Sequence, residues 1–182
     1  MTGQHLVAEM PPAIEVLRWL IVILLTIDLV VASINDVLYR KIPNWTVIAA
    51  AVLFLPWIFV GPQISILSAA MAGGVVFLVS FCLFAVRVMG AGDSKLLTVL
   101  AFFAGLDKVA EFIFLVALAG GVMAVWMFVT QPTKSLVLLQ MRGKGDSGVG
   151  VPYGIAISFG ALWILWWPLL ENILGPDPAA IF

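Results

Sequence analysis

Long apolar runs recur along this chain, and most approach the roughly 20 residues that a helix needs to cross a bilayer. Hydrophobic residues make up 63% of the 182 residues and charged residues only 10%, whereas soluble domains carry about 25% charged residues. Within lipid, a helix satisfies its own backbone hydrogen bonds, so uninterrupted apolar runs favour helices. The sequence therefore predicts an all-α, polytopic membrane protein.

Polar turns divide the apolar sequence into about six transmembrane helices. The expected spans are 14–34, 45–60, 64–86, 94–106, 109–130 and 152–170. We expect a single six-helix domain over 14–174, a polar tail over 1–13 and a C-terminal tail over 175–182. Small residues are spaced for close helix packing in two of these spans: Ala69 and Gly73, and Ala156 and Gly160.

Basic residues gather in the loops that follow the first, third and fifth spans. These residues are Arg40, Lys41, Arg87, Lys95, Lys134, Arg142 and Lys144. By the positive-inside rule these loops are cytoplasmic and both termini face outward. Asp36 and Asp93 are then both expected at the cytoplasmic ends of their helices.

The net charge and the rarest residue types exclude several functions. The net charge is −1 and no basic cluster exists, so nucleic acid is not an expected partner. The single cysteine, Cys82, excludes an internal disulfide and a thiolate metal cluster, and we expect it to be a small core residue. The single histidine, His5, lies in the N-terminal tail. We therefore expect no metal and no cofactor.

The most polar stretch near an apolar run is Gly90-Ala91-Gly92-Asp93-Ser94-Lys95. The two glycines leave the backbone open to close approach by another chain, and Asp93 stands where a helix N-cap is expected. An acid at membrane depth is expensive and is a candidate functional residue. Asp36 is a second acid at the same expected depth.

Two carboxylates from different helices at one depth are typical of an aspartyl protease. One member activates a water, while the protonated member donates a hydrogen bond to the scissile carbonyl. The open backbone at Gly90 and Gly92 could pair with an extended substrate. In the alternative interpretation, Asp36 and Asp93 only cap helices and pair with Arg40 and Lys95.

Asp28 supports a second alternative. It lies eight residues before Asp36, roughly 12 Å deeper on the same helix. Together with Asp36 and Asp93 it could serve a small proton or ion translocator. We expect instead that Asp28 is protonated and hydrogen-bonds a neighbouring helix. A third alternative is a non-catalytic component of a pilus or secretion assembly, which would not need both acids.

The segment Asp36-Val37-Leu38-Tyr39-Arg40-Lys41-Ile42-Pro43-Asn44, together with Gly90-Ala91-Gly92-Asp93-Ser94-Lys95-Leu96, resembles the prepilin peptidase family of GxGD-type aspartyl proteases. Val151-Pro152-Tyr153-Gly154 also resembles a motif that opens the last helix in that family. The resemblance implies that Asp36 and Asp93 are the catalytic pair. Supporting or substrate-binding roles are expected for Gly90, Gly92, Lys95, Arg40, Pro43 and Asn44.

The resemblance also implies a substrate and a location. The family removes the leader peptide of type IV prepilins and pseudopilins at the cytoplasmic face of the bacterial inner membrane, where lipid surrounds the enzyme. This chain lacks the N-terminal region with paired Cys-x-x-Cys motifs that N-methylates the product in larger members. It therefore resembles the short, peptidase-only branch of Flp-type (tight-adherence) pili. The oligomeric state stays open, and the 131–150 loop is either a lid over the site or a plain linker.

Overall fold

The computed structural model describes residues 11–61, 65–130 and 152–174, and every regular element in that part of the chain is a helix. The elements are α1 (Pro12–Tyr39), α2 (Asn44–Val60), α3 (Ile66–Ala85), α4 (Ala91–Thr130) and α6 (Tyr153–Leu174). Four of them are long and apolar enough to cross a membrane, and α2 is a shorter apolar helix. The all-α, multi-pass prediction is thus confirmed. The 131–150 segment and most of the two predicted tails lie outside the described residues.

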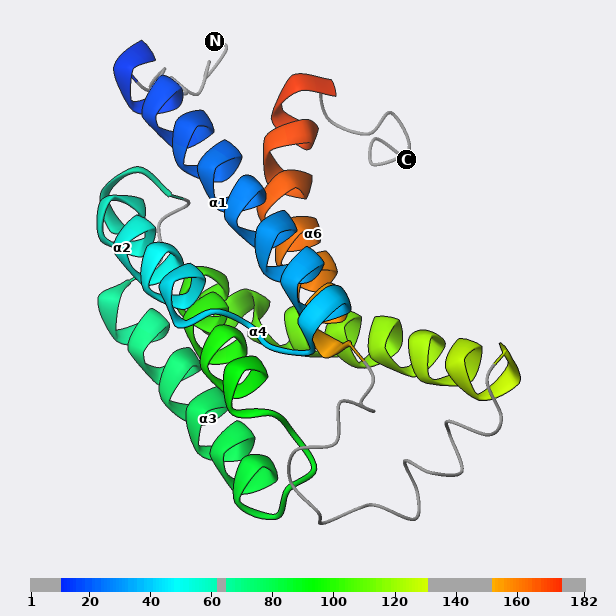
Figure 1. The fold of residues 1–182 in the computed structure, drawn as a ribbon. Helices are drawn as coiled ribbons and strands as arrows, with labels where there is room; N and C mark the ends of the chain where they lie inside the picture. Colours follow the sequence, from blue (N-terminus) through cyan, green and yellow to red (C-terminus); the bar gives the residue numbers. More distant parts are fainter. Residues whose placement is uncertain (1–10, 62–64, 131–151, 175–182) are drawn as a thin grey trace, which may run out of the picture.

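Helix α4 contains two of the predicted spans. Its 40 residues are interrupted at Gly105, whose φ of 59° and ψ of 179° are not helical. The backbone N–H of Leu106, which the break releases from the helix, donates to Ser68 Oγ of α3 at 2.9 Å. The first leg of α4 runs beside α3, and the second leg turns sharply away from it (Figure 1). The predicted boundary at Leu106 therefore lies one residue from the observed break.

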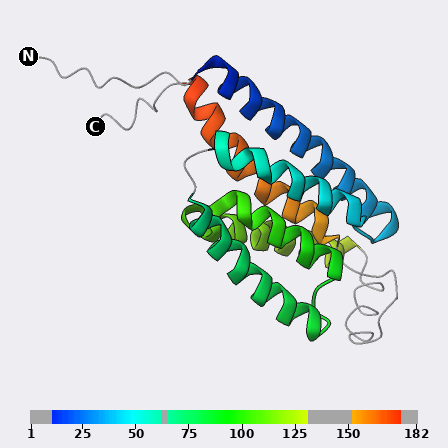
Figure 2. The same ribbon diagram turned by 90° about the vertical axis from the view of Figure 1, so that its left-hand side faces the viewer.

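Helices α1 and α6 run side by side in opposite directions (Figures 1 and 2). Hydrogen bonds join them at three positions along their length. Trp166 Nε1 donates to Thr26 Oγ1 at 3.0 Å, Ser33 Oγ donates to Ser158 Oγ at 2.9 Å, and Gly154 N–H donates to Asp36 at 2.7 Å. Polar contacts of this kind hold helices together within a membrane. They set the register of α1 against α6.

The small residues of α3 and α6 pack as expected. A Cβ added at Gly73 would lie 2.5 Å from the Phe102 ring on α4. A Cβ added at Gly160 would lie 2.7 Å from Val116 on the second leg of α4. Both glycines therefore allow a neighbouring helix to approach more closely than any other residue would.

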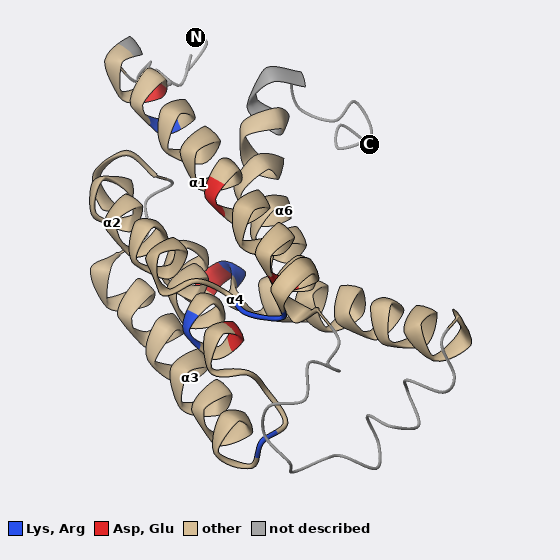
Figure 3. Ribbon diagram, viewed as in Figure 1, with Lys and Arg blue, Asp and Glu red and all other residues tan. Residues whose placement is uncertain are grey.

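Charged side chains are sparse along the helices (Figure 3). Several stand near helix ends, and Asp107, Lys108 and Glu111 follow the break in α4. Arg18 is buried and its Nε donates at 2.7 Å to the carbonyl oxygen of Val60, where α2 ends. The prediction for Cys82 is wrong, because this residue is exposed on α3. An apolar side chain facing lipid is as stable as one facing the helix bundle, so hydropathy alone did not distinguish the two positions.

Candidate active site

Asp36 lies in the last turn of α1, two residues past the end predicted for the first span, and its side chain is 6% exposed. Its Oδ2 accepts the backbone N–H of Gly154 at 2.7 Å. Gly154 is the second residue of α6, so its N–H is one of the amides that has no partner within the helix. The Asp36 carboxylate therefore occupies the N-terminus of α6, where the helix dipole favours negative charge.

Gly154 cannot carry a side chain without disturbing this contact. A Cβ at that position would lie 2.8 Å from Asp36 Oδ2 and 3.0 Å from Asp36 Cβ. Such distances are too short for real contacts, and both atoms belong to a buried residue. The glycine thus permits the approach of α1 to the end of α6.

The turn after Asp36 is built by its neighbours in the chain. Arg40 ends α1 in the left-handed conformation, with φ 54° and ψ 34°, and its N–H donates to the carbonyl oxygen of Asp36. Pro43 then precedes α2 in an extended conformation. Thr46 N–H and Oγ1 both donate to the Pro43 carbonyl, at 3.2 and 2.8 Å. This turn brings Ile42 back against α4.

Asp93 lies in the first turn of α4, two residues after the helix begins, and is partly buried. The expected N-cap position of Asp93 is therefore wrong, because Gly90 occupies it. The Gly90 N–H donates to the Asp93 carboxylate, and the Gly90 carbonyl accepts Ser94 N–H at 3.0 Å. The bond from Gly90 N–H to Asp93 is one half of a capping box, in which an acid at the third helical position reaches back to the N–H of the cap residue. The bond from Ser94 is the first backbone hydrogen bond of α4.

The fold brings the two acids together. They come from α1 and α4, and the charge of Asp36 acts directly on Asp93. Each carboxylate also stands at the N-terminus of a helix, Asp36 at that of α6 and Asp93 at that of α4. Two helix N-termini and two acids thus converge on one site.

Gly92 has a packing role that the sequence did not indicate. A Cβ at Gly92 would lie 3.0 Å from Ile42 Cβ and 3.5 Å from the Ile42 backbone nitrogen and oxygen. The glycine therefore lets the loop between α1 and α2 lie against the first turn of α4. This contact ties the segment next to Asp36 to the segment that holds Asp93.

The other predicted site residues lie around this contact. Lys95 Nζ donates to Asn44 Oδ1 at 3.2 Å, which links α4 to the start of α2. Within the described part of the chain no ion pair joins Lys95 to Asp93, so the pairing of these two residues in the alternative interpretation is not found. The positive charge of Arg40 does act on Asp36. Pro43 lies in the same loop, between Ile42 and Asn44.

Asp28 is not part of this cluster of contacts. It is 7% exposed, in the middle of α1, and neither of its oxygens has a hydrogen-bond partner among the described residues. The predicted hydrogen bond from Asp28 to a neighbouring helix is therefore not found. Between Asp28 and Asp36 the buried positions of α1 are the apolar residues Leu29 and Ala32.

Sequence reasoning missed the roles of Gly154 and Ile42. Both residues belong to the motifs that resemble the prepilin peptidase family, but the sequence indicated no structural role for either of them. No group of three or more His, Cys, Asp or Glu side chains that could hold a metal occurs in the described ranges. The site offers two carboxylates, helix-end amides and nearby basic side chains.

Comparison with known proteins identifies the family of this chain. Residues 23–125 match the model of the type IV leader peptidase family, a region that covers more than half of the chain and contains both acids of the site. A search of curated proteins and a search of solved structures each gave no significant match. The chain belongs to the type IV leader peptidase family.

Proposed function

We propose that this protein is an aspartic endopeptidase that removes the leader peptide of Flp-type prepilins, with Asp36 and Asp93 as its catalytic dyad. Family membership implies aspartic-type prepilin peptidase activity in general. The observation that carries the finer proposal is the convergence of Asp36 and Asp93, from two different helices, at two helix N-termini.

In this proposal Asp36 is the general base. The Gly154 amide, the N-terminus of α6 and the charge of Arg40 all stabilise its ionised form. Asp93, beside that charge, holds the shared proton and donates a hydrogen bond to the scissile carbonyl. Asp36 removes a proton from the water that attacks the carbonyl carbon. The tetrahedral intermediate then collapses, and the proton held by the dyad goes to the leaving amine.

The cytoplasmic location of the site is part of the proposal. Arg40 and Lys41 follow the end of α1, and Arg87 and Lys95 flank the start of α4. Four basic residues thus lie near the ends of the helices that carry the acids. By the positive-inside rule this end faces the cytoplasm of a bacterial inner membrane.

The translocator alternative lacks a supporting observation. A proton path from Asp28 to Asp36 would need a continuous chain of polar groups, whereas the hydroxyls that lie between them, those of Ser33 and Ser158, donate to each other and to the Leu29 carbonyl oxygen and not to Asp28. Asp28 itself has no hydrogen-bond partner among the described residues through which a proton could pass.

The proposal is tested by co-expressing the protein with an Flp-type precursor and, separately, with a precursor of another type IV pilin class. We expect the Flp-type precursor to be cut at the end of its leader and its new N-terminal amine to remain unmethylated, as read by mass spectrometry. Equal or preferential cleavage of the other precursor would refute the Flp-type assignment. A methylated product would refute the peptidase-only assignment.

A further inference from the structure

The first turn of α6 lies against the second leg of α4, where Tyr153 meets Gly120 (Figure 1). A Cβ added at Gly120 would lie 2.9 Å from Cε1 and 3.4 Å from Cδ1 of the Tyr153 ring, and 3.8 Å from Ala156 Cβ. The first of these distances is shorter than side chains tolerate, so any residue larger than glycine would displace the ring. Gly120 is also buried. The Tyr153 ring therefore occupies the space that a side chain at position 120 would need.

This contact lies next to the one that holds Asp36. Tyr153 is the first residue of α6, and Gly154, the second, donates its N–H to Asp36 Oδ2 at 2.7 Å. Planar peptide bonds leave only two soft torsions per residue, so a shift of Tyr153 is passed to the Gly154 amide. A shift of about half an ångström would stretch the bond to Asp36 to the long end of the usual range of about 2.7–3.2 Å.

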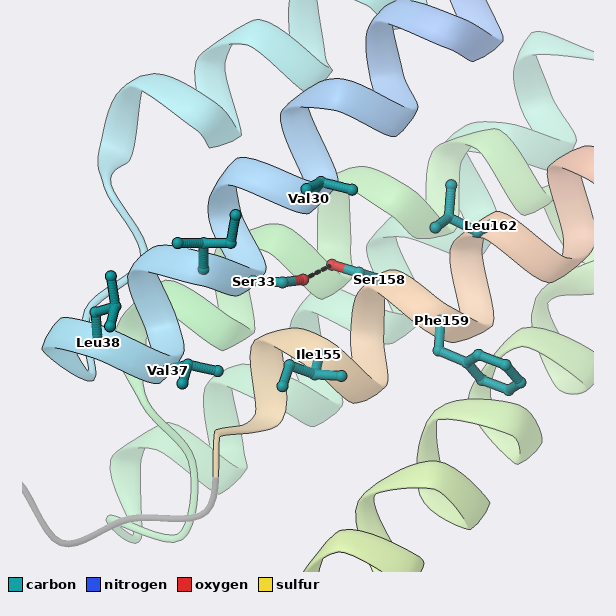
Figure 4. A pocket seen from close by; sticks show the side chains of 9 residues that line it. Val30, Ser33, Val37, Leu38, Ile155, Ser158, Phe159 and Leu162 are labelled. Carbon is teal, nitrogen blue, oxygen red and sulfur yellow. Dashed lines mark hydrogen bonds between the residues drawn. The ribbon is translucent and has the colours of Figure 1, made fainter.

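Contacts on both sides also hold the following turns of α6. On the side of α1, Ser33 Oγ donates to Ser158 Oγ at 2.9 Å, as the dashed line in Figure 4 shows. Ser158 Oγ donates in turn to the carbonyl oxygen of Leu29 at 3.3 Å. On the side of α4, a Cβ added at Gly160 would lie 2.7 Å from Val116. The helix is thus held between α1 and the second leg of α4 beyond its first turn as well.

We infer that Tyr153 is a positioning residue for Asp36. Its ring, packed against Gly120, sets the first turn of α6, and that turn presents the Gly154 amide to the carboxylate. The inference rests on the proposed function, in which Asp36 is the general base. It gives α4 two roles, because the first leg carries Asp93 and the second leg supports the other acid through α6.

Steady-state kinetics of precursor cleavage test the inference. Tyr153→Ala removes the ring, and Gly120→Ala displaces it without changing Tyr153. Both variants should lower kcat about tenfold and leave KM within about threefold, since misplacing a catalytic group by about 1 Å can cost up to a hundredfold in rate. Tyr153→Phe keeps the ring and should recover most of the kcat that Tyr153→Ala loses. The matched control is Gly121→Ala, where the new Cβ would meet nothing within 4 Å, and its kinetics should equal those of the wild type.

Double variants distinguish a positioning role from packing alone. If Gly120 acts through the bond from Gly154 to Asp36, Gly120→Ala should lower kcat no further once Gly154→Ala has already disturbed that bond. Gly120→Ala should likewise cost little once Tyr153→Ala has removed the ring. Changes that act through one contact are not additive, whereas changes at independent sites are. Membrane levels and thermal midpoints in detergent, measured for every variant, show whether a loss of kcat reflects a loss of folded protein.

Three results would overturn the inference. The first is an equal fold-loss from Gly120→Ala in the wild type and in Gly154→Ala, and the second is a wild-type kcat in Tyr153→Ala. The third is a higher KM in Tyr153→Ala with kcat unchanged, which would make Tyr153 a substrate-binding residue. In all three cases the wild type still cuts the precursor and the peptidase proposal stands.

Two further outcomes are also decisive. If Gly120→Ala does not accumulate in membranes, Tyr153→Ala, alone and combined with Gly154→Ala, decides in its place, because removing a ring that is 37% exposed introduces no clash. If the wild type cuts no precursor, the proposed function itself fails, and the inference fails with it.

Discussion

The backbone N–H of Gly154 and Oδ2 of Asp36 are 2.7 Å apart, although 118 residues separate them in the chain. Through this contact the last helix of the described chain positions the acid at the end of the first. Gly154→Ala would place a Cβ 2.8 Å from the same oxygen. A charge-assisted hydrogen bond contributes about 1.5–3 kcal/mol, so its loss should lower kcat roughly tenfold to a hundredfold.

The matched control for Gly154→Ala is Gly121→Ala, since a Cβ at Gly121 would meet nothing within 4 Å. Both variants should accumulate in membranes to wild-type levels, and only Gly154→Ala should process a precursor slowly. Equal turnover by the two variants would show that the Gly154 contact does not position Asp36 for catalysis.

Gly92 and Ile42 form a second contact that can be tested through its partner. Gly92→Ala should destabilise the protein, because the new Cβ would lie 3.0 Å from Ile42 Cβ and overpacking typically costs about 1–3 kcal/mol. Gly92→Ala should cost less thermal midpoint in detergent and less activity in an Ile42→Gly background, which lacks that Cβ, than in the wild-type background.

The same variants also distinguish a packing role of Gly92 from a role in substrate access. If Gly92 serves only to expose backbone to the substrate, Gly92→Ala will cost as much in the Ile42→Gly background as in the wild type. A smaller loss of both stability and activity in that background would show that the glycine holds the loop between α1 and α2 against α4.

Gly105 should be required for the sharp change of direction between the two legs of α4. Its φ of 59° and ψ of 179° lie in a region open almost only to glycine, and forcing another residue there costs about 1–3 kcal/mol. Gly105→Ala should therefore lower the midpoint of thermal unfolding, whereas Gly74→Ala, at an open helical position, should change it little. An unchanged midpoint in Gly105→Ala would contradict the strained conformation.

Asp28 should be dispensable for cleavage and costly for stability. Its two oxygens are buried without a partner among the described residues, and burying an unpartnered polar group costs about 1–3 kcal/mol. Asp28→Leu should raise the thermal midpoint and retain activity. Loss of processing in Asp28→Leu, with normal membrane levels, would indicate that this acid takes part in the reaction.

The helices could be predicted from the sequence and the two acids could be selected as candidates, because both depend on local patterns. Apolar runs mark the spans, and the short run before Leu106 correctly indicated the break that Gly105 makes in α4. Asp36 and Asp93 stand out because acids are rare near apolar runs. The spacing of Gly73 and Gly160 likewise predicted close helix packing, which the neighbouring Phe102 and Val116 confirm.

Contacts between segments that are distant in the chain could not be predicted from local sequence patterns. The bond from Gly154 to Asp36 and the approach of Ile42 to Gly92 depend on how α1, α4 and α6 are placed in space. The exposure of Cys82 was missed for a different reason, since lipid and helix interior are both apolar and hydropathy does not separate them.

The most direct test of the dyad is a gel-shift assay of precursor cleavage by the wild type and three variants at matched membrane levels: Asp36→Ala, Asp93→Ala and Asp28→Ala. We predict that the first two abolish processing and that Asp28→Ala remains active. Normal cleavage by either Asp36→Ala or Asp93→Ala would contradict the catalytic pair proposed for this protein.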